Sequence, residues 1–93
     1  MTIKVLSQTL TSNAEQDISI PVGSMMLHAR ELSGDIAVWY RCDDNAPMKT
    51  RKMAIRATDD EAPAPNQADY VGTAILDGGA TVWHVFERVT GRV

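Results

Sequence analysis

Few side chains in this sequence could perform chemistry, and their spacing matches no catalytic or metal-binding motif. The two histidines, His28 and His84, lie far apart, and Cys42 is the single cysteine. Zinc sites need several histidine or cysteine ligands at short, characteristic spacings, which this chain lacks. No nucleophile motif such as G-x-S-x-G accompanies Cys42 or a serine. We therefore expect no metal, no cofactor and no enzymatic activity.

Basic side chains are the other group with chemical potential, because five of the nine fall within sixteen positions. They are Arg41, Lys49, Arg51, Lys52 and Arg56. A run of this kind is usually a solvated strand face that protects a sheet edge from aggregation. The alternative is contact with an anion, a nucleotide or an acidic protein. For that alternative the candidate residues are Arg41, Arg51, Lys52 and Arg56.

Composition limits the classes of partner and compartment. Ninety-three residues with a net charge of -3 suffice for one domain, 1–93, and give no general attraction to nucleic acid or anionic membranes. One cysteine excludes an intrachain disulfide framework, and we find neither a secretory signal nor a run of about 20 apolar residues. We expect a cytoplasmic protein in a host cell, with no membrane partner.

Short blocks of alternating apolar and polar residues, separated by turn residues, are the main structural signal. They predict an all-β domain of about seven short strands, either a small antiparallel β-sandwich or a partly open barrel. The predicted strands are 3–10, 17–21, 25–32, 35–42, 50–57, 70–76 and 80–89. A loop is expected at about 57–69, where acidic residues precede two prolines.

Two predicted hairpins can be registered, because a two-residue turn fixes which residues face each other. The turn Ser33-Gly34 places Leu32 opposite Asp35, Ala29 opposite Val38, His28 opposite Trp39 and Leu27 opposite Tyr40. The turn Gly78-Gly79 places Ile75 opposite Val82, Thr73 opposite His84, Ala74 opposite Trp83, Gly72 opposite Val85 and Val71 opposite Phe86. One face of each hairpin is predicted to join the core. Its members would be Leu27, Ala29, Ile36, Val38, Tyr40, Val71, Ile75, Val82 and Phe86, joined by Ile3, Val5, Ile18, Ile20, Met53 and Ile55.

The opposite faces of these hairpins carry more apolar residues than a solvated sheet surface should. Met26, His28, Trp39, Trp83 and Val85 lie there and are our candidates for a partner interface. An intrachain cover, another subunit of a homo-oligomer or a foreign protein would each account for them. Tryptophan and methionine are enriched in the cores of protein interfaces.

Two stretches carry a family resemblance. Residues 18–24 read I-S-I-P-V-G-S and residues 70–87 read Y-V-G-T-A-I-L-D-G-G-A-T-V-W-H-V-F-E. In these stretches the chain resembles a family of short, uncharacterised phage and prophage proteins with the pattern Y-[IV]-G-T-x-x-L-x-G-G-A-x-V-[FW]-H-V-[FY]-E. The chain departs from that family at residues 57–60, where a glycine- and histidine-containing turn is expected. The resemblance implies a phage or prophage gene and transfers no catalytic residues.

Together these observations predict a binding protein. The first hypothesis is a phage or prophage accessory domain that docks on another protein, as a virion component or as an inhibitor of a host defence factor. The alternative is a homo-oligomer that sequesters an anionic small molecule or nucleotide signal with the basic residues.

Overall fold

The computed structural model describes residues 2–89, and within that range the chain is almost entirely β-structure. The elements are β1 (Ile3–Leu10), β2 (Glu15–Pro21), β3 (Met25–Leu32), β4 (Asp35–Asp43), β5 (Met48–Ala57), β6 (Ala68–Leu76), the short 3-10 turn η1 (Asp77–Gly79) and β7 (Thr81–Arg88). The predicted all-β class is confirmed. Each predicted strand matches an observed strand, and both of its bounds lie within two residues of the observed ones. Residues 58–67 form the loop between β5 and β6.

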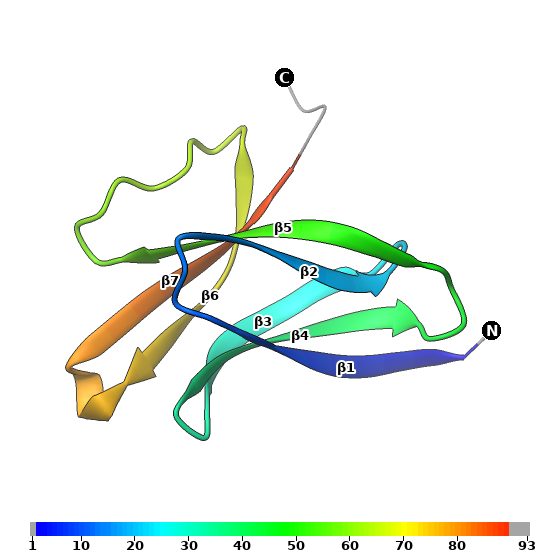
Figure 1. Cartoon of the computed structure of the whole chain (residues 1–93), viewed down its shortest axis with the longest axis horizontal. Helices are drawn as coiled ribbons and strands as arrows, with labels where there is room; N and C mark the ends of the chain where they lie inside the picture. The colour runs from blue at the N-terminus through cyan, green and yellow to red at the C-terminus, as the bar shows by residue number, and fades with distance from the viewer. Residues whose placement is uncertain (1, 90–93) are drawn as a thin grey trace.

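All seven strands belong to one sheet, in the order β1-β4-β3-β6-β7-β5-β2. Neighbouring strands are antiparallel except β3 and β6, which run parallel and are joined at Ala29 and Gly72. The sheet curls into a nearly closed barrel, with β1 and β2 as its two edges (Figure 1). The short segment 11–14 joins the end of β1 to the start of β2, and the two edge strands diverge from it (Figure 1).

The register of the β3–β4 hairpin is confirmed near its turn and fails farther away. Leu32 pairs with Asp35, Ala29 with Val38, and His28 with Trp39. A bulge then inserts one extra residue between Met26 and His28, so that Met26, and not Leu27, lies opposite Tyr40. Leu27 is consequently exposed, and its predicted place in the core is wrong.

The β6–β7 hairpin keeps the predicted pairs from its turn to Gly72, loses the predicted pair of Val71 with Phe86, and presents the opposite face to the core. Gly72 pairs with Val85 and Ala74 with Trp83, as predicted, and Ala74 and Val85 are fully buried. Ile75 is exposed, and a bulge at Val71 places Tyr70 opposite Phe86. The predicted core positions of Ile75, Val82 and Phe86 are therefore wrong.

Close approach of β3 explains why the smaller residues of β6 face inward. A Cβ atom added to Gly72 would lie 2.2 Å from the carbonyl oxygen of Ala29 and 2.6 Å from its nitrogen. Only a glycine therefore lets β3 and β6 meet at this bridge. The large residues of β6 are left on the outer face, so residue size at one crossing decides which face of the hairpin is buried.

The predicted core positions of Ile3 and Val5 on β1 are also wrong. Ile3 pairs with Asp43 and Val5 with Arg41, on the outer face of β4, and both apolar side chains are exposed. The alternate residues Leu6 and Leu10 face the interior, where Leu10 is buried. Both faces of β1 carry apolar residues, so the alternation of its sequence does not reveal which face is covered.

The core is aliphatic, as the composition requires. Its buried members are Leu10, Ile18, Ile20, Ala29, Ile36, Val38, Tyr40, Cys42, Met53, Ile55, Ala74 and Val85, with Met26, Val71, Leu76 and Trp83 packed against them. Burial raises the pKa of Tyr40. Within residues 2–89 there is no helix of the length and apolar character needed to cross a membrane.

Candidate functional site

The outer surface of β1, β4 and β3 exposes several apolar side chains, and we call it the Trp39 face. It carries Ile3, Val5, Met25, His28, Arg30, Trp39 and Arg41. The three strands place these residues in rows across the sheet, because pairing partners share a face. One row is Val5, Arg41 and Met25, and the next is Ser7, Trp39 and His28.

Trp39 is the centre of this face and is flanked by cations. The Arg30 guanidinium lies 5.5 Å from the indole ring centroid, which is cation–π distance. On the next row, Arg41 donates a hydrogen bond to the sulfur of Met25 at 3.3 Å. The face therefore combines a half-buried aromatic ring, exposed aliphatic side chains and two positive charges, a composition typical of protein interfaces.

The structure divides the five predicted interface residues. His28 and Trp39 do lie on the Trp39 face. Val85 is fully buried, so its predicted place in an open interface is wrong. Met26 and Trp83 pack against the core and are partly buried, and their role in an interface stays a prediction. They face inward because Gly72 and the Leu27 bulge set the orientation of β6 and β3. The chain's own core covers that part of the apolar surface.

The structure brings together only two of the four predicted anion-binding residues, Arg51 and Lys52, which line one pocket. Arg41 lies on the Trp39 face, and the other three lie on β5, where neighbouring residues point to opposite faces. Lys52 pairs with Asp17 at 3.6 Å, and Arg56 pairs with Glu15 at 2.7 Å. Arg51 forms an ion pair with Glu87. Each of the three β5 cations thus already has an internal carboxylate.

An open pocket of about 520 Å³ lies where β7 ends beside β5, and we call it the barrel mouth. It is lined by Lys49, Thr50, Arg51, Lys52, Asp69, Glu87, Arg88 and Val89. At its base, Arg51 binds Glu87 and also donates to the carbonyl oxygen of Ser24 at 3.0 Å. These two side chains are only 20% and 11% exposed, so the pair is largely desolvated and closes this end of the core.

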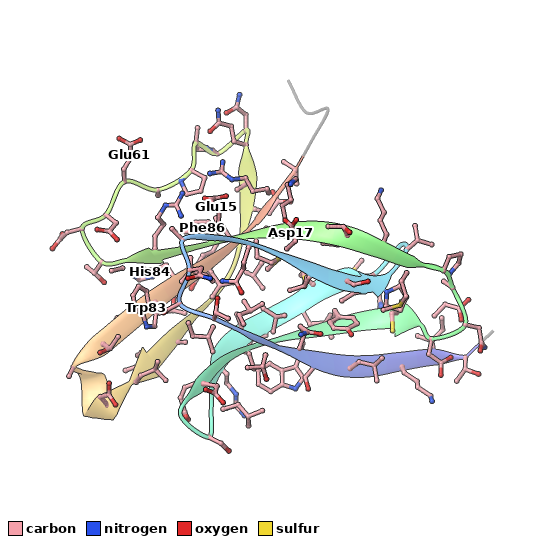
Figure 2. All side chains as sticks on the ribbon, in the orientation of Figure 1. Glu15, Asp17, Glu61, Trp83, His84 and Phe86 are labelled. Carbon is pink, nitrogen blue, oxygen red and sulfur yellow. The ribbon has the colours of Figure 1, made fainter. Side chains whose placement is uncertain are left out.

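A second ionic cluster, which we call the Glu15 clasp, joins three strands on the outer face of the sheet. Glu15 on β2 accepts two hydrogen bonds from Arg88 on β7, both at 3.0 Å, and one from Arg56 on β5 at 2.7 Å. Arg56 also donates to the carbonyl oxygens of Ala14 and Glu61, which fastens the 58–67 loop. Glu15 and Phe86, both labelled in Figure 2, belong to one row of the sheet, because Ala54 on β5 pairs with each of them. Arg56 is therefore a structural residue.

The clasp should make stability depend on pH. Hydrogen bonds from Arg88, and then from Arg56, lower the pKa of Glu15 from 4.5 to about 2. A carboxylate with a depressed pKa in the folded state stabilises the fold above pH 4.5, and this contribution disappears as the pH falls toward 2. The side chain is 51% exposed, so screening reduces the full effect of roughly 3 kcal/mol.

We expect Glu15→Gln to lower the free energy of unfolding by about 1 kcal/mol at pH 7 and to have almost no effect near pH 2. Urea denaturation of both proteins from pH 2 to 7 measures this difference. Asp17→Asn is the matched control, because both side chains of the ion pair between Asp17 and Lys52 are exposed to solvent. An equal loss at pH 7 and pH 2 would contradict the ionic role of Glu15.

His84 is held by hydroxyl groups on the outer face of β7. Its Nε2 lies 2.9 Å from Thr58 Oγ1, and its Nδ1 lies 3.2 Å from Thr73 Oγ1. Thr73 in turn forms a hydrogen bond with the Tyr70 hydroxyl. A hydroxyl can donate or accept, so both imidazole nitrogens are satisfied in either neutral tautomer. His84 therefore fastens the 58–67 loop to the sheet.

Among residues 2–89, no group of three or more histidine, cysteine, aspartate or glutamate side chains could hold a metal ion. Cys42 is buried. The surface that sequence reasoning missed consists of Ile3, Val5 and Met25, which were assigned to the core or left unassigned. The apolar character of both faces of residues 3–10 was the signal that could have identified it.

Comparison with known proteins gives one match. No curated protein and no solved structure is similar to the chain at a significant level. The model of a family described as a domain of unknown function (DUF7352) matches residues 1–92, which is almost the whole chain. A match of this extent covers all seven strands and therefore the Trp39 face, the barrel mouth and the Glu15 clasp. The chain therefore belongs to the DUF7352 family.

Proposed function

We propose that this protein is a phage- or prophage-encoded accessory domain that works in the host cytoplasm by binding another protein through the Trp39 face. The domain would act either as a virion component or as an inhibitor of a host defence factor. The resemblance of residues 18–24 and 70–87 to phage and prophage proteins supports the origin. The Trp39 face supports the mode of action.

The observation that carries this proposal is the exposure of aliphatic side chains around an aromatic centre. Ile3, Val5 and Met25 are each more than half exposed. Val5 and Met25 lie in the row next to that of Trp39, and Ile3 lies one row farther along β1. Several exposed apolar side chains gathered on one face of a folded domain mark an interaction site. Arg41 lies between Val5 and Met25, and Arg30 lies over Trp39, so a partner that brings carboxylates to an apolar surface fits best.

Sequestration of an anionic small molecule has less support. The barrel mouth gathers Lys49, Arg51, Lys52 and Arg88, but Glu87, Asp17 and Glu15 already bind three of these cations. An anionic ligand would have to compete with each carboxylate. The Trp39 face has no such internal competitor, so protein binding is the better explanation.

Replacing Trp39 should weaken binding to the partner substantially. Buried tryptophans often contribute 2 kcal/mol or more at interfaces, so we expect Trp39→Ala to weaken binding at least about 30-fold. A photo-crosslinking amino acid at position 25 in host cells would capture the partner, and titration of the purified pair by calorimetry would measure affinity.

Ile75→Ala is the matched control, because Ile75 is an exposed apolar residue of β6 outside the Trp39 face. Crosslinking from position 75 should yield no common product. Equal affinities of the Trp39→Ala and Ile75→Ala proteins for the captured partner would refute the proposed surface. So would a failure to crosslink any protein from position 25 in cells that express the gene.

A further inference from the structure

Strand β1 is an open edge of the sheet. Within the described residues it pairs with β4 on one side and with no strand on the other. It is eight residues long, contains no proline or glycine, and has no bulge in its pairing with β4. Such an edge presents unpaired backbone donors and acceptors that can pair with another strand.

The opposite edge of the sheet is protected. Strand β2 carries Glu15 and Asp17 and ends at Pro21, which has no backbone N–H to donate. Charged residues and proline are devices that prevent edge pairing. One open edge and one protected edge favour a contact between two identical strands, which closes at two copies, over a head-to-tail contact that would grow into a filament.

The charge and residue pattern of β1 is compatible with a second copy of itself. Lys4 is its single charged residue, and its ammonium group is bound by Asp44 at 2.8 Å. Antiparallel pairing must match residues of the same face. A symmetric register that does so places Val5 opposite the partner's Val5, Ile3 opposite the partner's Ser7, and Lys4 opposite the partner's Leu6. No like charges meet across the pair.

The same register joins the two Trp39 faces. Val5 lies beside Arg41, which lies beside Met25, so the row would run from Met25 through two valines to the partner's Met25. The two Arg41 positions would be three strand spacings, or about 14 Å, apart. This exceeds the screening length of about 8 Å at physiological salt, so their repulsion is small.

We propose that two copies of this chain associate through antiparallel pairing of their β1 strands, with Val5 at the two-fold axis. The dimer presents one continuous surface built from two Trp39 faces. This inference goes beyond the proposed function, because self-association is independent of any foreign partner. A foreign strand on β1 is the competing occupant.

A charge-reversal pair tests both the contact and its register. In Val5→Lys and Val5→Glu, identical charges would face each other across the axis, so each variant should dissociate at least about tenfold more readily than the wild type. An equimolar mixture should recover the dimer, because lysine then faces glutamate. Sedimentation equilibrium from 1 μM to 1 mM measures the dissociation constants, and circular dichroism checks that both variants are folded.

Ile75→Lys is the control, since Ile75 and Val5 are 58% and 59% exposed and only Val5 lies on β1. A monomeric wild type at 1 mM would overturn the proposal, as would a dimer that Val5→Lys leaves intact or a mixture that does not recover. If the wild type is monomeric at 1 mM, pairing of β1 with a strand of a foreign protein replaces the dimer as the explanation of the open edge. Trp39→Ala should leave the dimer unchanged, which separates failure of this inference from failure of the partner proposal.

Discussion

Gly72→Ala should destabilise the domain by about 3 kcal/mol or more, the largest effect we expect from adding a single methyl group. The new Cβ would lie 2.2 Å from the Ala29 carbonyl oxygen and 2.9 Å from its carbonyl carbon. Both atoms belong to backbone, so no side chain can rotate away. The β3–β6 bridge must open, and it is the one parallel contact in the described sheet.

Gly34→Ala separates this steric effect from the general cost of losing a glycine. Gly34 has φ +85°, which an alanine rarely adopts, but no atom lies within 4 Å of its added Cβ. Its loss should be about 1 kcal/mol, from backbone strain alone. Urea denaturation of both variants measures the difference. If Gly72→Ala were no more destabilising than Gly34→Ala, the close approach of β3 and β6 would be wrong.

Glu87→Ala should lower the free energy of unfolding by about 3 kcal/mol, because it leaves the Arg51 guanidinium largely buried without its carboxylate. For a domain of this size that corresponds to a fall in Tm of roughly 10–20 °C. Thermal and urea denaturation at pH 7 provide the measurement. The remaining contact of Arg51, with the carbonyl oxygen of Ser24, cannot neutralise its charge.

Removing both charges should restore much of this stability. Replacing a buried ion pair with apolar residues of similar size is often neutral or stabilising, so Arg51→Met with Glu87→Leu should be more stable than Glu87→Ala alone. Asp17→Ala removes one partner of an exposed pair and should cost less than about 0.5 kcal/mol. A Glu87→Ala loss as small as that of Asp17→Ala would refute the buried ion pair.

Much of the fold could be predicted from sequence because alternation and turn residues are local signals. The Ser33-Gly34 and Gly78-Gly79 turns fixed the hairpin registers as far as the first bulge. The bulges at Leu27 and Val71 could not be predicted, since an extra residue leaves no clear mark on the alternation. The buried face of β6–β7 was also hidden, because the contact between Gly72 and Ala29 joins positions far apart in the chain.

Prediction of the candidate site was less complete. His28 and Trp39 were placed on one surface correctly, because they lie within the part of the hairpin whose register held. Ile3 and Val5 were assigned to the core, since sequence alone does not show that β1 would be an edge beside β4. The internal partners of Arg51 and Arg56 are carboxylates 36 and 41 residues away, and this separation concealed their structural role.

The Glu15 clasp has a kinetic consequence. Glu15 and Arg88 are 73 positions apart. We expect the strands that they join to meet only after the local β3–β4 and β6–β7 hairpins have formed. Contacts of such long range form late, because closing a large loop carries a high entropic barrier. The clasp is then absent from the transition state for folding. It would leave the folding rate almost unchanged and slow unfolding, so it lengthens the lifetime of the native protein.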